Sequence, residues 1–188
     1  MRVSQAQGWR TIPSMKKFQK SKEPVGFLDE KPSGAALDAI DRRILRALQR
    51  DSLIGNQDLA EQIGLSPPAC LKRVRRLREA GVIECTVAIL SPDALDYPLL
   101  TVVRVKLDGP LDDAKNAFEG RIAGSPRVMQ CLLVAGEIDY VLLVRSRDVA
   151  HYQDFARRML RAAPIRSYTS EIVLEVNKAT TELPIDTG

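Results

Sequence analysis

The feature that most constrains the fold is a helix stop followed almost at once by a helix start. Gly64 tolerates the left-handed backbone conformation that ends a helix, and Ser66 followed by Pro67 is typical of the beginning of the next helix. We therefore predict a helix over residues 56–63, a tight turn, and a second helix over residues 67–80.

A further helix precedes this pair, because apolar residues recur at helical spacing up to about Arg50. Its predicted N-cap is Asp38, and the predicted caps of the next two helices are Asn56 and Ser66, whose side chains can accept bonds from free backbone N–H groups. Three short helices joined in this way predict a helix-turn-helix unit over residues 35–82, of the kind that places its last helix in the major groove of DNA. The periodic apolar residues are Leu37, Ile40, Ile44 and Leu48.

Charge supports this interpretation locally rather than globally. The chain has a net charge of +4, but the excess lies in residues 1–36, and residues 95–188 are slightly acidic. The informative cluster is the run of cations between Leu71 and Glu79, which could also be an ordinary solvated helix face. On a helical wheel the packing face holds Leu71, Val74 and Leu77, Lys72 and Arg76 point away from it, and Arg73 and Arg75 lie at its flanks.

A basic outer face of this kind neutralises DNA phosphates. We assign base readout to Lys72 and Arg73, with Arg76 as a third candidate, because arginine reads guanine with two hydrogen bonds. With so few base readers, we expect degenerate sites and a contribution from DNA shape. The predicted DNA-contacting residues are Gln57, Ser66, Pro67, Pro68, Ala69, Lys72, Arg73, Arg75 and Arg76.

The rest of the chain predicts a hinge and a second domain. Residues 83–98 should form a hinge and linker, with a strand from Val82 to Leu90. Residues 99–184 alternate between apolar runs of strand length and amphipathic helices in the order βαββαβ, which predicts a ferredoxin-like sheet with both helices on one face. The predicted strands are 100–107, 128–134, 140–144 and 168–176, and the predicted helices are 111–123 and 148–163.

Several function classes are disfavoured. Residues 1–34 are rich in lysine and proline, and we expect a disordered basic tail there. No apolar run approaches the roughly 20 residues of a membrane helix and no secretory signal is visible, so we expect a soluble cytoplasmic protein. The three cysteines suit no disulfide framework, His151 is the only histidine, and no catalytic motif occurs. We therefore expect no enzyme activity, no metal site and no cofactor.

Four separated segments resemble the Lrp/AsnC family of leucine-responsive, or feast/famine, regulators. Residues 37–45 resemble the family's first helix, and residues 65–83 its recognition helix. Residues 133–140 resemble its effector-domain hairpin, while 172–174 and 180–184 resemble its last strand and tail. The match covers about residues 37–184.

This resemblance implies an α+β chain with an N-terminal winged helix-turn-helix domain and a C-terminal ferredoxin-like βαββαβ domain. It implies a hinge strand near residues 85–90 that pairs between subunits, and a homodimer that assembles into a tetramer, octamer or larger particle. It also implies an amino acid or related effector, for which Gly136 and Asp139 are carried over, with Ile138 and Tyr140 added by adjacency. Glycine would allow close approach of the ligand to backbone.

The implied function is a regulator that binds double-stranded DNA in a bacterial or archaeal cytoplasm or nucleoid. Residues 163–165 and 168–171 differ from the usual family pattern, which leaves a ligand-independent architectural DNA binder as one alternative. A small-molecule sensor or enzyme without DNA binding is the other. If no amino acid changes the DNA footprint or the oligomer size, the architectural binder is favoured. If the protein fails to bind DNA at low salt, the sensor or enzyme is favoured.

Overall fold

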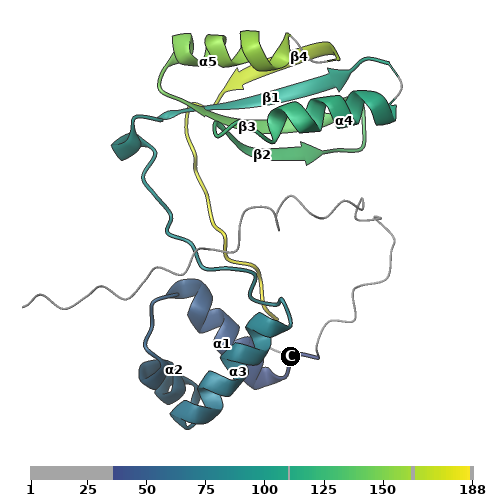
Figure 1. Ribbon diagram of the computed structural model, residues 1–188. Helices are drawn as coiled ribbons and strands as arrows, with labels where there is room; N and C mark the ends of the chain where they lie inside the picture. The colour runs from purple at the N-terminus through teal and green to yellow at the C-terminus, as the bar shows by residue number, and fades with distance from the viewer. Residues whose placement is uncertain (1–35, 110, 162–163, 187–188) are drawn as a thin grey trace, which may run out of the picture. The chain divides into compact units, whose positions relative to one another are not determined.

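The computed structural model describes residues 36–109, 111–161 and 164–186 (Figure 1). The tail predicted over residues 1–34 lies outside this part of the chain. Three helices come first, α1 (Ala39–Arg50), α2 (Asn56–Ile63) and α3 (Pro67–Glu79), close to the bounds predicted from the sequence.

The caps of α1 and α2 differ in how well they were predicted. Asp38 caps α1 as expected, because its carboxylate accepts a hydrogen bond from the Asp41 backbone N–H at 2.7 Å, and the Asp41 carboxylate accepts one from the Asp38 N–H at 3.3 Å. The prediction of Asn56 as the cap of α2 was wrong, since Gly55 holds that position. Asn56 is instead the first helical residue, and its side-chain amide donates to the carbonyl oxygen of Pro67 at 2.9 Å.

The turn between α2 and α3 forms as the glycine and proline predicted. Gly64 adopts a φ of 77°, and the backbone N–H of Leu65 donates to the carbonyl of Ala60 at 2.9 Å. Ser66 occupies the N-cap of α3 with extended backbone, but its side chain makes no capping bond with the described residues. Pro67 at the first helical position needs no N–H partner.

The three helices share one apolar core, to which the C-terminal segment adds. Gln49 of α1 bonds the backbone of Leu183 twice, accepting from its N–H at 2.7 Å and donating to its carbonyl at 3.1 Å. Ile185 packs half-buried against the same core. The buried core residues are Ile44, Leu45, Ala47, Leu59, Ala60, Ile63, Cys70, Val74 and Leu77.

The segment predicted as a hinge strand forms no strand within the described chain. Residues 84–90 make no backbone ladder with the described residues, and the next regular element is the 3₁₀ turn Asp93–Leu95. A strand needs a partner for its N–H and carbonyl groups, and this one has none within its own described chain. Val87, Ile89 and Leu90 of this segment are exposed.

The C-terminal domain has the predicted order βαββαβ. Its elements are β1 (Leu99–Leu107), α4 (Leu111–Ile122), β2 (Val128–Leu133), β3 (Tyr140–Ser146), α5 (Val149–Phe155) and β4 (Ile165–Ile172), and the helix of α5 continues as a π-helical turn over Ala156–Leu160. The strands lie in the order β2-β3-β1-β4, with antiparallel pairing throughout. Strand β4 ends earlier than predicted because β1 begins at Leu99, so few β1 residues remain to pair beyond Ile172.

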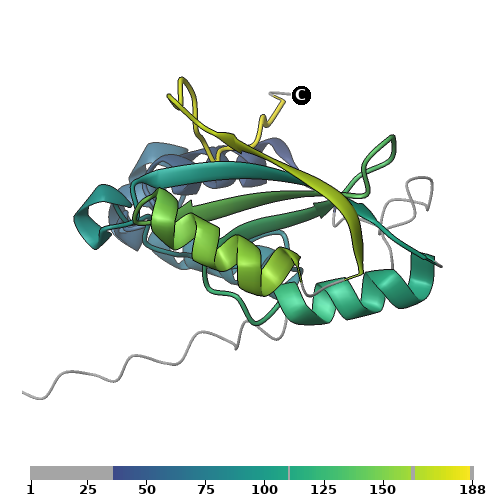
Figure 2. The same ribbon diagram turned by 90° about the horizontal axis from the view of Figure 1, so that it is seen from above.

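Both helices cover one face of this sheet (Figure 2). Phe118 of α4 and Phe155 of α5 share a core with Val103, Val105 and Leu142 of the central strands. The opposite face carries the alternate strand residues, which are only half-buried or exposed within the described chain. Its apolar centre is formed by Val102, Val141 and Leu143, and beside it Arg104 donates to Glu171 at 2.7 Å.

Candidate functional site

The exposed side of α3 is the strongest candidate for contact with DNA. Lys72, Arg75 and Arg78 are exposed and form no ion pair with any residue in the described ranges. Lys72 points away from the apolar core of the helix, Arg75 lies at its flank, and Arg78 lies at the edge of the packing face beside Val74. A surface of this kind supplies positive charge to a polyanion without first having to release an internal partner.

Two other arginines of α3 are engaged with α1. Arg73 donates to the carboxylates of Asp38 at 2.7 Å and Asp41 at 2.9 Å, and Arg76 also donates to Asp41. The hydrogen bonds that Arg73 donates to Asp38, then to Asp41, raise the pKa of Arg73. The backbone N–H of Asp41 and the guanidinium of Arg73 in turn lower the pKa of Asp38.

This pairing differs from the prediction that Arg73 reads a base. Its side chain is only 29% exposed, and two carboxylates already hold its guanidinium. Arg76 is 49% exposed and has one carboxylate partner, so it keeps an open side. Lys72 and Arg76 both reach the surface, as the helical wheel predicted, but only Lys72 does so without a partner in the described chain.

The remaining predicted DNA contacts lie at the start of α2 and α3. Gln57, Ser66, Pro67 and Pro68 are exposed, and Ala69 is half-buried. No acidic residue occurs in the first turn of α3, so nothing there opposes the positive end of the helix dipole. The Ser66 hydroxyl makes no capping bond, so it and the free backbone N–H groups at this helix end could both donate hydrogen bonds to a phosphate oxygen.

In the C-terminal domain, the side chain of Tyr140 points away from the other predicted effector residues. Gly136 adopts a φ of 145° in the β2–β3 hairpin, and Ile138 is half-buried. The carboxylate of Asp139 accepts from the Leu107 backbone N–H at 2.7 Å and from Lys106 Nζ at 3.1 Å. These two contacts, the backbone bond first, lower the pKa of Asp139.

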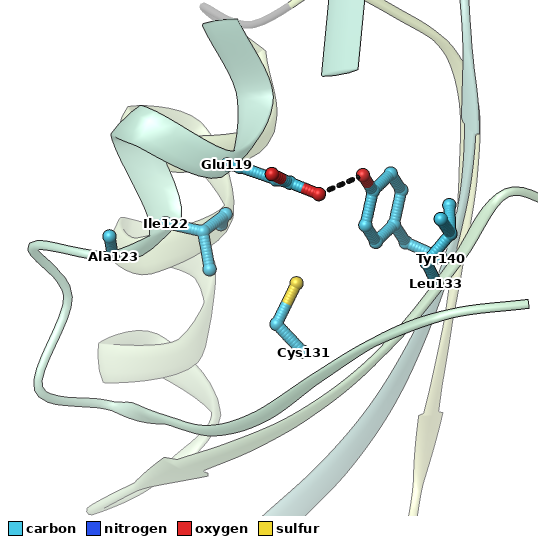
Figure 3. A pocket seen from close by; sticks show the side chains of 6 residues that line it. All are labelled: Glu119, Ile122, Ala123, Cys131, Leu133 and Tyr140. Carbon is cyan, nitrogen blue, oxygen red and sulfur yellow. Dashed lines mark hydrogen bonds between the residues drawn. The ribbon is translucent and has the colours of Figure 1, made fainter. Parts of the chain in front are cut away.

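Tyr140 points to the helix-covered side of the sheet instead. Its hydroxyl donates to Glu119 of α4 at 2.6 Å, and burial, followed by this carboxylate, raises its pKa. The two residues border a cavity of about 250 Å³, into which the thiol of Cys131 also points (Figure 3). Burial and Glu119 raise the pKa of Cys131 to about 11. The other lining residues are Ile122, Ala123 and Leu133.

Sequence reasoning missed the partners in both places. It treated Asp38 only as the N-cap of the first helix, and it named no tertiary partner for Asp41 or Glu119. The signal for these contacts is three-dimensional, because 32 to 35 residues separate Asp41 from Arg73 and Arg76.

The remaining features of the described residues are their potential metal ligands, the length of their helices and the contact of His151. No group of three or more potential metal ligands occurs among them. No helix in this part of the chain is long and apolar enough to cross a membrane. His151 accepts a bond from the Arg147 backbone N–H at 3.2 Å, a local contact at the start of α5.

Comparison with known proteins agrees with both halves of the structure. The profile described as winged helix-turn-helix DNA-binding matches residues 37–84, and the Lrp/AsnC ligand binding domain matches residues 100–183. The leucine-responsive regulatory protein of Haemophilus influenzae is 40% identical over 152 residues, which cover 80% of this chain and 92% of that protein.

Solved structures give the same result. An AsnC family transcriptional regulator from Agrobacterium tumefaciens is similar with a TM-score of 0.75 and 35% identity, over 78% of this chain and 96% of that one. A transcriptional regulator of Neisseria meningitidis, solved as a complex with L-Met, is similar with a TM-score of 0.77 and 32% identity, over 80% of this chain and 97% of that one.

Proposed function

The chain belongs to the Lrp/AsnC family of transcriptional regulators, and on that basis we propose how its residues divide the work of binding DNA and binding an effector. It is a helix-turn-helix DNA-binding regulator with an amino-acid-binding domain. The observation that carries the proposal is the row of exposed, internally unpaired cations on α3, Lys72, Arg75 and Arg78, within the described residues.

We assign these three cations to DNA phosphates and Arg76 to a base edge. Gln57, Ser66 and the start of α3, from Pro67 to Ala69, lie where a helix-turn-helix protein meets the backbone and the nearest bases. Arg73 keeps a supporting role, because its guanidinium is already bound to two carboxylates. The DNA-binding domain then spans residues 35–82, and residues 83–98 are the hinge and linker.

Residues 99–184 are proposed to bind the effector and to join subunits. The uncovered sheet face has an apolar centre, Val102, Val141 and Leu143, that a second copy would bury. The exposed apolar residues of segment 84–90 likewise suit pairing with the same segment of a partner. We propose a homodimer that assembles further into a tetramer, octamer or larger particle.

The proposed effector is an amino acid or related metabolite. In the hairpin, Gly136 and Asp139 offer an open backbone and a carboxylate, and Ile138 lies between them in sequence. An ammonium group at Asp139 would have to displace or share its contact with Lys106 Nζ. Tyr140 would act indirectly, since its side chain lies on the other side of the sheet with Glu119. We propose no catalytic role, no metal and no further cofactor, and a cytoplasmic location.

The test combines DNA selection with effector titration. The purified protein is used to select duplexes from a random-sequence library, and their binding is then measured while each of the twenty amino acids is added. A regulator of the proposed kind enriches a sequence, and at least one amino acid changes its affinity or the particle size in sedimentation. Enrichment without any amino-acid response favours the ligand-independent architectural binder, and failure to bind DNA at low salt refutes the proposal.

A further inference from the structure

We infer that Asp41 is a positioning residue for DNA recognition: a buried carboxylate on α1 holds the guanidinium of Arg76 on α3 in place to read a base. The inference rests on the proposed function, because it assumes that α3 enters the major groove. It goes beyond that function by placing a determinant of sequence specificity on a helix that does not itself face the DNA groove.

The geometry around Asp41 supplies the first argument. Its side chain is fully buried, although it carries a charge. One carboxylate oxygen accepts from Arg73 Nη1 at 2.9 Å, and the other accepts from Arg76 Nη2. A buried carboxylate is costly unless it is paired and hydrogen-bonded, so the two arginines and Asp41 hold one another in a defined arrangement.

The second argument is the difference between the two arginines. Arg73 lies between two carboxylates and is the less exposed of the pair, so it serves mainly to join α3 to α1. The guanidinium of Arg76 uses one N–H group toward Asp41 and makes no other hydrogen bond with the described residues. A guanidinium has five N–H donors in a rigid fork, so most of them remain available to a ligand.

The third argument concerns the cost of binding. An exposed arginine samples many rotamers, and fixing it on DNA loses that freedom. The contact with Asp41 restricts Arg76 before DNA binds, and it leaves the half-exposed side of the guanidinium facing outward. The remaining N–H groups of the guanidinium match the O6 and N7 acceptors of guanine. A phosphate contact does not require this fixed orientation. Asp41 should therefore affect discrimination between sequences more than overall affinity.

The test compares Asp41→Asn with the unmodified protein on two duplexes. One is a duplex that the unmodified protein selects from a random library, and the other is a scrambled duplex of the same length and composition. We expect the ratio of the two dissociation constants to fall by about tenfold or more, as for loss of one good base contact. Affinity for the scrambled duplex should stay the same or rise, because the variant loses a negative charge.

The matched control is Asp58→Asn, which makes the same charge change at an exposed position of α2. Its ratio should equal that of the unmodified protein. If Asp41 were merely structural, Asp41→Asn would lower the thermal midpoint and weaken binding to both duplexes equally, and that result overturns the inference. If the unmodified protein selects no sequence at all, the proposed function fails first, which is a distinct outcome.

A second variant covers the case in which Asp41→Asn does not fold. Arg76→Lys keeps the positive charge at a half-exposed position but removes the fork, and it should lower the ratio to a similar extent. Where both variants fold, the double variant should be little worse than either alone, since both remove the same contact. An Arg76→Lys ratio within twofold of the unmodified protein, or fully additive losses, would refute the role of Asp41.

Discussion

The division of the α3 cations into paired and unpaired groups predicts a difference in salt dependence. Lys72, Arg75 and Arg78 have no acidic partner in the described chain, whereas Arg73 has two. Each phosphate contact contributes about 0.9 to the slope of log affinity against log salt concentration. The proposed dimer presents every residue twice, so replacing one of the cations assigned to phosphate by glutamine should reduce the slope by about 1.8.

The same replacement at Arg73 should change the slope far less. Its charge is already balanced by Asp38 and Asp41, so few counterions are released through it when DNA binds. Arg73→Gln should instead lower the thermal stability of the helical domain, because it leaves Asp41 buried with one fewer partner. The two classes of variant therefore differ in which measurement they change.

The assay is fluorescence anisotropy with a labelled scrambled duplex, titrated at several salt concentrations between about 50 and 200 mM. Each variant is first checked by circular dichroism and by sedimentation, so that unfolding or dissociation is not mistaken for lost phosphate contacts. The reasoning is refuted if Arg73→Gln reduces the slope as much as Lys72→Gln does. It is also refuted if none of the three unpaired cations changes the slope.

Three other predictions concern the cysteines, Asp139 and the C-terminal segment. Cys85 and Cys131 are both exposed. Because its surroundings in the cavity and Glu119 raise the pKa of Cys131 to about 11, Cys131 should react with a thiol reagent at pH 8 far more slowly than Cys85, and equal rates in mass spectrometry would contradict this environment. Asp139 has a lowered pKa when folded, so its stabilising effect is present above about pH 4 and is lost as the pH falls through the folded value. Asp139→Asn should accordingly flatten the acid side of the thermal stability profile, and an unchanged profile would show that its two contacts contribute little. Gln49→Ala removes both side-chain bonds to the C-terminal segment, at about 1 kcal/mol each, and should raise hydrogen exchange over residues 182–186; unchanged protection there would contradict this docking.

The helices and the domain order could be predicted from the sequence because their signals are local. Gly64 permits the left-handed conformation that ends α2, Pro67 fixes its own φ at the start of α3, and Asp38 caps the helix that it precedes. The hinge strand could not be predicted in the same way. Its apolar, β-branched residues favour extended structure, but a strand also needs a partner, and the described part of this chain supplies none for residues 84–90.

The effector residues show a different limit. Asp139 and Tyr140 are neighbours in sequence, and adjacency suggested a shared site. Asp139, however, lies in the bend before β3, whereas Tyr140 is the first residue of β3. Asp139 bonds to the end of β1, while Tyr140 points to the helix-covered face and bonds to Glu119 of α4. Assigning effector residues by their match to a family motif uses only their order in the sequence. It does not show to which side of the sheet each side chain points.

The tertiary partners of Asp41 could not be predicted from the sequence, because its position in the first turn of α1 already explains an acidic residue there. An acid in the first turn of a helix already has a reason to be there, since it favours the helix dipole and completes the capping box with Asp38. Neither role requires the side chain to be fully buried, yet Asp41 is. Complete burial of a charged group implies partners of opposite charge, and the nearby basic helix supplies Arg73 and Arg76. Acidic residues of α1 thus neutralise part of the positive charge of α3. A count of cations along the sequence therefore overstates how many of them are available to DNA.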